Sequence, residues 1–468
     1  METLQRTANR GSVSTGYDVD NSCKLEADNT EYLQRTVSST GNRDVGTVSC
    51  WVKRTELGAH MYLFTFGDTD NDTGRTYIKF QNTNTLRVGG GSTLWRETDR
   101  LFRDTASWYH IVVAFDTTQS TANDRIKIYI NGVQETSFST TNNPSQNDDL
   151  GINFEKQTIG FNSIDNDSPF SGYITEIVGL DGTASDATSF GEFDSDTGIW
   201  IPKSVSASGT NGFYLDFEDS SNMGNDKSGG TDFTENNITA ADQATDTCTN
   251  NFCTWLSDGT LFNAGTDNET FSEGGTKFNT RAGTGWTTAY PTQSFAGGKW
   301  YMEVKVHETS ATTMYGAMPV TRINSRTYQD LHLGQDVDGS IGIYANNGQI
   351  YIGTAGSGGS GGALSAGDIV GIAIDMENYK IYFAVNNTYV ESGDPAGNSN
   401  GRSIEQEPYV FAVAHFTVST VEETNFGGYT SMSNTHTNND GEGRGNFIYA
   451  PPSGFLACCS KNLGETGG

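Results

Sequence analysis

The stretch of residues 108–138 constrains the fold of this chain more than any other segment. An apolar, β-branched run at residues 110–115 is bounded by polar turn residues, which predicts a buried strand. Isoleucines then alternate with Lys and Tyr across residues 126–130, a pattern typical of a half-buried strand. Asn131-Gly132 follows, and both residues tolerate the positive φ of a tight hairpin turn. We therefore expect residues 133–138 to return as a third antiparallel strand.

Short strands separated by dense turn signals continue through the rest of the sequence. The chain has 468 residues with 56 Gly and only 9 Pro, and long helical patterns are nearly absent. At roughly 150 residues per domain, this length suggests two or three domains, each large enough to bury a core. The pattern predicts an all-β protein built from β-sandwiches.

The charge of the chain excludes some partners. The sequence contains 28 Lys and Arg against 57 Asp and Glu, a formal net charge of −29. The negative electrostatic potential of such a chain repels nucleic acid and anionic membranes, so we expect neither nucleic-acid binding nor membrane insertion. Two interpretations of the charge stay open: solubility with resistance to self-association, and the binding of cations.

Targeting signals and cysteines point to assembly in a reducing cytoplasm. The first residues lack the apolar region of a signal peptide, and no run of about 18 apolar residues predicts a transmembrane helix. The cysteine spacing fits no zinc motif, so free buried thiols are expected. The cysteines are Cys23, Cys50, Cys248, Cys253, Cys458 and Cys459.

Ordered motifs in the first half carry a family resemblance. They are SCWVKR, WYHIVVAFD, RIKIYINGV, FSGYITEIVGLDG and FGEFDSDTGIWIPK. Together, over residues 16–205, they resemble a laminin G-like, concanavalin A-type domain, in the form common in tail-fibre and other virion-surface proteins of tailed phages. The resemblance implies a jelly-roll sandwich.

A second set of motifs resembles a SPRY (B30.2-like) domain over residues 260–428. They are GGKWYMEVKV, GDIVGIAIDMENYKIYFAVNNTY, the run at residues 409–413 and Asn425-Phe426-Gly427. We thus expect two concanavalin-type jelly-roll sandwiches. The expected division is a laminin G-like domain at residues 1–205, a strand plus polar linker at 206–258, a SPRY-like domain at 259–428 and a tail at 429–468.

Two segments outside the expected sandwiches, the polar linker and the C-terminal tail, contain apolar residues that could dock on a folded domain. Residues 219–251 lose strand periodicity and read as a linker, although Phe233 and Ile238 could fix the segment on a surface. Residues 447–455 hold three aromatic residues and a Pro-Pro pair. This stiff apolar cluster predicts a strap that docks on a sandwich or, alternatively, on a neighbouring subunit.

Candidate ligand and metal sites are few. Asp68, Asp70 and Asp72 alternate as in a calcium loop, but Thr73 and Lys79 replace the expected Gly and Glu, so a solvated hairpin loop is the competing interpretation. Residues 165–167 offer a second possible calcium site or a simple turn. The SPRY resemblance places partner-binding loops at one end of the sandwich. There it points to Tyr315, Arg322, Arg326 and Tyr328, of which Tyr328 could instead cap the core.

Catalysis is not expected. The paired-carboxylate pattern of concanavalin-type glucanases is absent, and Glu192, Asp194 and Asp196 alternate only within a Gly- and Ser-containing loop. His110 lies on a strand and is interpreted as structural. No nucleophile elbow or phosphate loop occurs.

The resemblance implies a non-enzymatic phage virion structural protein, made in the host cytoplasm and placed on the virion surface. As a fibre, spike or surface component it would contact other virion proteins, copies of itself and a host-surface glycan or protein. The alternatives are a glycan-active enzyme on a concanavalin-type sandwich and a cytoplasmic adaptor. No cofactor is expected, apart from a possible calcium ion.

Overall fold

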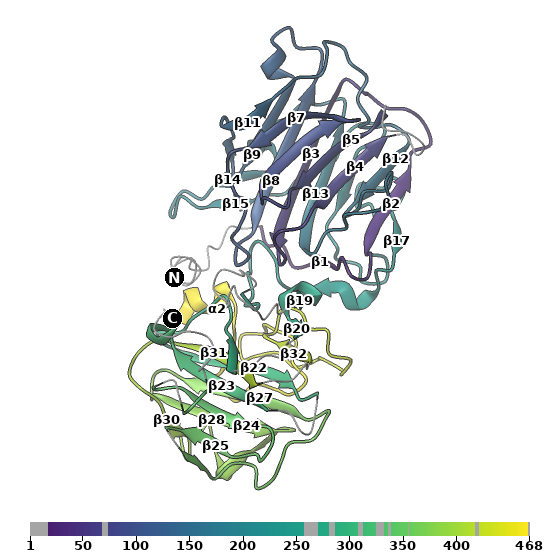
Figure 1. Cartoon of the computed structure of the whole chain (residues 1–468). Coiled ribbons are helices and arrows are strands. Elements are labelled where there is room, and N and C mark those ends of the chain that lie inside the picture. Colours follow the sequence, from purple (N-terminus) through teal and green to yellow (C-terminus); the bar gives the residue numbers. More distant parts are fainter. Residues whose placement is uncertain are drawn as a thin grey trace. The chain divides into compact units, whose positions relative to one another are not determined.

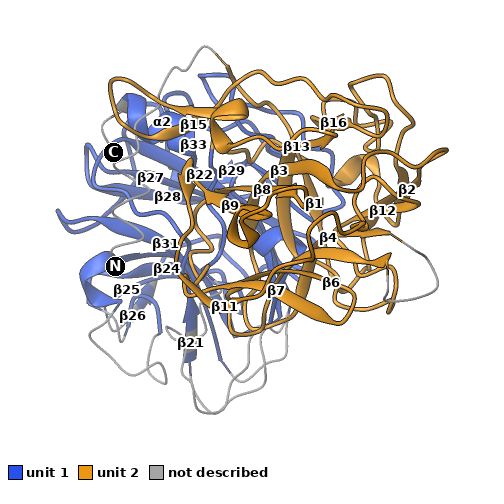
Figure 2. Cartoon of the chain, turned by 90° about the horizontal axis from the view of Figure 1, so that it is seen from above, with its two compact units in different colours: residues 1–12, 251–468 blue, residues 13–250 orange. Residues whose placement is uncertain are grey.

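The structure of the chain is a computed structural model (Figure 1). It describes residues 17–67, 74–256, 270–279, 286–307, 312–323, 332–335, 338–353, 355–416 and 421–466. The chain forms two compact units, an N-terminal unit that ends at Asn250 and a C-terminal unit that begins at Asn251 (orange and blue in Figure 2). Both are built from antiparallel sheets, so the all-β prediction is confirmed. No helix in these ranges is long and apolar enough to cross a membrane.

Two eight-stranded sheets form the N-terminal unit. The first sheet runs β10 (Val133–Gln134), β9 (Ile126–Ile130), β8 (Tyr109–Asp116), β3 (Val45–Arg54), β13 (Gly172–Asp181), β1 (Ser22–Leu25) and β18 (Gln243–Ala244), with β16 (Phe213–Leu215) beside β13. The second runs β11 (Phe138–Thr141), β7 (Thr93–Thr98), β6 (Leu86–Gly90), β5 (Thr76–Phe80), β4 (Met61–Gly67), β12 (Lys156–Ile159), β2 (Tyr32–Thr36) and β17 (Thr234–Asn236). A separate ribbon pairs β14 (Gly191–Phe193) with β15 (Trp200–Pro202).

The core of the N-terminal unit is the apolar side of these alternating strands. Ile126, Ile128 and Ile130 of β9 are buried together with residues of β8, β3 and β4. The turn between β9 and β10 has positive φ at both Asn131 (48°) and Gly132 (81°), as the sequence predicts. Burial of large apolar side chains contributes roughly 1.5–3 kcal/mol each, so this cluster is the main source of the unit's stability.

The third strand of the predicted meander is shorter than expected. Strand β10 ends at Gln134, the last backbone bond to β9 runs from Glu135 N–H to the Ile128 carbonyl at 2.8 Å, and Phe138 already belongs to β11 in the other sheet. The reason is local: the carboxylate of Glu135 accepts hydrogen bonds from the backbone N–H groups of Thr136 and Ser137, both at 3.2 Å. These bonds turn the chain from one sheet to the other.

Residues 219–251 were predicted to be a linker, with fixation on a surface through Phe233 and Ile238 as the alternative. The alternative holds for residues 219–250, which are packed on the N-terminal unit. Met223, Phe233 and Ile238 are buried in its core, and the segment supplies β17 and β18 to the two sheets. Its polar anchors are buried as well: Lys53 Nζ lies 2.7 Å from the Asp246 carboxylate. The N-terminal fold therefore continues to Asn250 and does not end near residue 205.

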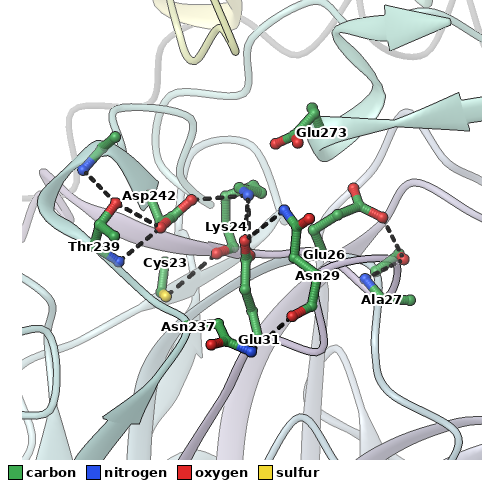
Figure 3. Close-up of polar contacts among 12 residues, drawn as sticks. Cys23, Lys24, Glu26, Ala27, Asn29, Glu31, Asn237, Thr239, Asp242 and Glu273 are labelled. Carbon is green, nitrogen blue, oxygen red and sulfur yellow. Dashed lines mark hydrogen bonds and ion pairs between the residues drawn. The ribbon is translucent and has the colours of Figure 1, made fainter.

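Lys24 is a second buried cation that fixes this segment (Figure 3). Its Nζ lies 2.9 Å from Glu31 Oε2 and 2.8 Å from Asp242 Oδ1, and its side chain is 1% exposed. Asp242 ends the 3-10 helix η4 (Ala240–Asp242), where it forms a capping box with Thr239. The ion pair between Lys24 and Asp242 thus joins the capped turn at η4 to strand β1.

A nine-stranded and a six-stranded sheet form the C-terminal unit within the described ranges. The larger sheet runs β19 (Thr270–Ser272), β20 (Lys277–Asn279), β32 (Val421–Asn425), β22 (Lys299–Lys305), β27 (Ile369–Asp375), β28 (Lys380–Val385) and β29 (Thr388–Tyr389), with β30 (Arg402–Ser403) beside β28 and β33 (Leu456–Ala457) beside β22. The smaller runs β21 (Trp286–Ala289), β31 (Tyr409–Phe416), β23 (Thr313–Pro319), β24 (Ile341–Tyr344), β25 (Ile350–Ile352) and β26 (Ala355–Ser357).

Helical structure is limited to short pieces. The chain's α-helix in the described ranges is α2 (Ser460–Thr466). The other 3-10 helices are η2 (Ala122–Asp124), η3 (Ala187–Ser189), η5 (Glu273–Gly275), η6 (Val320–Arg322) and η7 (Val390–Ser392).

The C-terminal tail lies along the outer face of the larger sheet. Phe447 and Phe455 are fully buried there, and Tyr449 is half-buried. Phe447 meets Tyr301 edge to face, with 5.2 Å between ring centroids, and β33 pairs in parallel with β22. The backbone N–H groups of Ile448 and Tyr449 donate to the buried carboxylate of Glu303 at 2.9 and 2.7 Å.

Candidate functional site

A polar pocket of about 310 Å³ opens on the N-terminal unit. Three segments line it: residues 74–76 at the start of β5, residues 90–93 with Trp95 around the β6–β7 turn, and residues 148–151. Its volume falls at the lower end of the range for small-molecule sites, roughly 300–1,000 Å³. We refer to these residues together as the rim pocket.

Glycines allow the segments of the rim pocket to approach closely. A Cβ on Gly90 would lie 2.2 Å from Cζ2 of Trp95, so the indole lies directly against the β6 backbone. A Cβ on Gly151 would lie 2.3 Å from the carbonyl oxygen of Gly74. The Gly151 N–H donates to Thr76 Oγ1 at 2.9 Å, which fixes the third segment on β5. The floor of the pocket is therefore backbone. Trp95 belongs to the core and is 6% exposed, so a small part of its indole forms the apolar wall.

The side chains that line the rim pocket are mostly hydrogen-bond acceptors and hydroxyls. Asp148, Asp149, Ser92 and Thr93 are exposed. Arg75 is the cation of the pocket lining, and Asp165 holds its guanidinium: Arg75 Nη1 lies 2.6 Å from Asp165 Oδ2. Exposed carboxylates and hydroxyls beside an aromatic wall suit a ligand that offers many hydroxyl donors.

The carboxylates of the second possible calcium site are bound by side chains of the chain itself. Hydrogen bonds from Asn162 first, and then from Arg75, lower the pKa of Asp165. Asn162 Nδ2 also donates to Asp167 Oδ1 at 2.7 Å, and Asn166 adopts a positive φ of 55°. This arrangement is a braced turn. Among the described residues, no group of three or more His, Cys, Asp or Glu side chains is placed to hold a metal ion.

The predicted calcium loop at Asp68, Asp70 and Asp72 lies outside the described residues. Arg326 and Tyr328 of the predicted partner-binding loops also lie outside them.

Tyr315 is not part of an exposed loop. It lies in β23 between β24 and β31, and its side chain is completely buried in the core of the C-terminal unit. Burial, followed by the charge of Glu422, raises the pKa of its hydroxyl. The binding role expected for Tyr315 is therefore corrected to a structural one, because the strand pattern turns its ring inward.

Arg322 of η6 remains near the surface. Its guanidinium lies 3.7 Å from the Glu405 carboxylate and 3.9 Å from that of Glu407. Such partly exposed ion pairs contribute little to stability.

The alternating acidic residues 192–196 form a turn. Asp194 Oδ1 accepts hydrogen bonds from the Thr197 N–H and hydroxyl, both at 2.7 Å, and from the Asp196 N–H at 3.1 Å. These bonds, that of the Thr197 hydroxyl first, lower the pKa of Asp194. The carboxylate thus caps the β14–β15 turn, and none of the three acids lines the rim pocket.

His110 is a buried structural residue, as interpreted from the sequence. Trp200 Nε1–H donates to its Nδ1 at 3.0 Å, so Nε2 carries the proton and faces the Ser49 hydroxyl at 2.9 Å. Burial lowers the pKa of His110 to about 3, which keeps the imidazole neutral. The ring also stacks on Trp51 at 4.8 Å.

Sequence reasoning missed the rim pocket. Its three segments are distant in sequence, and the glycine run at residues 89–91 lacks the following Lys-Ser/Thr of a phosphate loop. The available signal was the combination of a Gly-rich turn with an aromatic residue two positions after two hydroxyl residues. Such a pattern indicates that another segment approaches the backbone closely at this turn. It does not indicate which segment of the chain that is.

Comparison with known proteins identifies both units. Residues 27–187 match the laminin G-type model of the concanavalin A-like lectin/glucanases superfamily. Residues 299–427 match the SPRY domain model. The chain contains a laminin G-like domain followed by a SPRY domain. No curated protein matches the sequence.

Three solved structures illustrate the likeness. A human SPRY domain is 17% identical, with a TM-score of 0.24, and the match covers 32% of this chain and 91% of that domain. A candidate carbohydrate-binding protein from Bacteroides ovatus is 15% identical, with a TM-score of 0.33, over 47% of this chain and 59% of the other. A heptameric SAP-like pentraxin from Limulus polyphemus is 15% identical, with a TM-score of 0.27, over 36% and 79%.

Proposed function

We propose that this protein is a non-enzymatic binding protein whose laminin G-like domain binds carbohydrate at the rim pocket. The observation that carries the proposal is the pocket itself: a backbone floor, the Trp95 wall, and exposed hydroxyls and carboxylates on a domain of the lectin/glucanase superfamily. Sugars present both hydroxyl donors and apolar C–H faces, which such a lining complements.

The SPRY domain is proposed to bind a protein partner or a further copy of the chain. Its fold is supported by the domain match, and Arg322 is the described candidate contact at its surface. The domain order and the motifs that resemble tailed-phage surface proteins support a role as a virion-surface component that contacts host cells. Electron microscopy of labelled native particles tests this placement, because an unlabelled virion would contradict it.

The carbohydrate proposal is tested by binding of a glycan array to the full chain, followed by calorimetry of the best ligand. The double variant Ser92→Ala/Asp148→Ala removes two exposed groups of the pocket. Each lost hydrogen bond is worth about 1 kcal/mol, so binding should weaken at least about tenfold. Asp196→Ala, on the β14–β15 turn outside the pocket, is the matched control and should bind normally. Equal affinity of the double variant would place the site elsewhere.

A further inference from the structure

The rim pocket has an excess of acceptors over available cationic donors. Asp148 and Asp149 are exposed carboxylates, and the Asp149 side chain is 72% exposed. In the described part of the chain, the side chain of Asp148 makes no hydrogen bond or ion pair. Among the described residues, the partner of the Asp149 carboxylate is the Arg43 guanidinium, at 3.9 Å. Two exposed carboxylates therefore line the pocket, and a guanidinium lies near one of them.

Both arginines near the pocket are held by other acceptors. Arg75 Nη1 lies 2.6 Å from Asp165 Oδ2, and its Nη2 donates to the Gly91 carbonyl at 3.2 Å. Arg43 donates through Nε to the Leu150 carbonyl at 2.7 Å and through Nη2 to the Asp149 carbonyl at 3.2 Å. These bonds brace the pocket walls, so neither guanidinium is positioned to receive a ligand carboxylate in a bidentate fork.

From this charge arrangement we infer that the rim pocket selects uncharged, hydroxyl-rich glycans and rejects glycans that carry uronic acid or sulfate groups. The inference rests on the carbohydrate-binding function proposed above. Sugar hydroxyls can donate charge-assisted hydrogen bonds to Asp148 and Asp149, whereas a ligand carboxylate would face them as a like charge. The net charge of −29 acts in the same direction at longer range.

The test compares neutral and acidic disaccharides that differ only at C6: the gluco-, galacto- and manno-configured sugars and their uronate counterparts. Calorimetry with the full chain should give at least about tenfold weaker binding for each uronate than for its neutral partner. Asp148→Asn/Asp149→Asn should reduce this ratio to about threefold or less, because both charges are removed while the shape is kept. Glu192→Gln/Asp196→Asn removes two exposed charges outside the pocket, so it is the charge-matched control and should leave the ratio unchanged.

The outcomes separate the inference from the function on which it rests. Uronates that bind as tightly as their neutral partners would overturn the inference and leave carbohydrate binding intact. A ratio lost equally in Glu192→Gln/Asp196→Asn would also overturn it, because the selection would then come from net charge rather than from the pocket. If none of the six sugars and no member of a wider glycan array binds, both the proposed function and the inference fail.

Discussion

Arg35 and Asp226 lie 191 positions apart in the sequence, and Arg35 Nη1 donates to Asp226 Oδ2 at 3.0 Å. Both side chains are almost fully buried, at 4% and 0% exposed. Arg35 Nε also donates to Gln157 Oε1 at 2.7 Å, and the guanidinium lies 4.6 Å above the ring centroid of Phe233. One side chain thus joins strands β2 and β12 to the segment between β16 and β17.

Removing one partner of this pair should destabilise the laminin G-like domain strongly. Asp226→Ala leaves the Arg35 charge buried without its counter-ion, which costs about 3–5 kcal/mol in the free energy of unfolding. Urea denaturation monitored by tryptophan fluorescence measures the change. The double variant Arg35→Met/Asp226→Leu should recover part of the loss, because no buried charge remains. A single variant with wild-type stability would show that the pair contributes nothing.

Fragments of the chain should locate the end of the laminin G-like domain. A fragment of residues 17–250 retains β16, β17, β18 and the buried Phe233, so it should unfold in one cooperative transition. A fragment of residues 17–205 lacks them and exposes part of the core, so it should aggregate or melt without a sharp transition. Differential scanning calorimetry compares the two. Equal melting temperatures would mean that residues 206–250 do not contribute to the stability of the domain.

The sequence predicts the strands well and misplaces the segment before residue 250 for a physical reason. Strand periodicity is local, so residues 110–115 and 126–130 are identified from their neighbours alone. The anchors of the later segment are polar: Asp226, Asp242 and Asp246 each pair with a buried cation far away in the chain. From composition alone, these aspartates are expected to be exposed to solvent, because the sequence does not show which distant cation each one pairs with.

The candidate site was harder to predict than the fold. Trp95 and the Gly-rich turn are visible in the sequence, but residues 148–151 join them only through the sheet topology. Tyr315 shows the opposite error: the family resemblance suggested exposure, whereas β23 is buried along its whole length and the ring lies in the core.

Glu303 should make the stability of the SPRY domain depend on pH. Burial raises the pKa of its carboxyl to about 7, against an ordinary value of 4.5, although backbone N–H groups of Tyr449 and Ile448 and the side chains of Tyr301 and Asn425 act in the opposite direction. The folded state therefore binds a proton between these values that the unfolded state has released. The contribution to stability is fully present below about pH 4.5 and is lost as the pH rises to about 7, on the order of 3 kcal/mol in total.

The variant Glu303→Gln tests this dependence. Denaturation of the wild-type chain at pH 5 and pH 8 should show a decrease in stability that is smaller in the variant. Glu377→Gln, at an exposed carboxylate, is the control and should behave as wild type. Glu176 of the laminin G-like domain also has a pKa raised to about 7 by burial, so the comparison uses the difference between variant and wild type. An unchanged pH dependence in Glu303→Gln would contradict the assignment.

The protein should not hydrolyse glycans. Asp194 is held by three hydrogen bonds in a turn, and Glu192 is exposed on a ribbon outside the rim pocket. Incubation of purified protein with a broad polysaccharide panel should release no reducing sugar above a heat-denatured control. Release that disappears in Glu192→Gln/Asp194→Asn would refute the non-enzymatic proposal and favour the glycan-active alternative.

The tail should stabilise the SPRY domain through Phe447. Its ring is completely buried against Tyr301, and a Cβ on Gly445 would lie 2.6 Å from its Cε2, so the ring fills a close-fitting site. Phe447→Ala should cost about 3–5 kcal/mol in the free energy of unfolding. Tyr449→Ala is the matched control in the same strap: its ring is only half-buried, and its backbone bond to Glu303 does not need the side chain. It should cost less than half as much.

Truncation after Gly445 separates stabilisation within one chain from contact between chains. Because the removed residues include Phe447, Phe455 and β33, the truncated chain should melt at a clearly lower temperature even when it is monomeric. Light scattering coupled to size-exclusion chromatography reports assembly in the same samples. If the truncated chain keeps its melting temperature and loses only its assembly, the tail acts between subunits. If both are kept, the segment makes no energetic contribution, and the buried aromatic contacts would not explain its position.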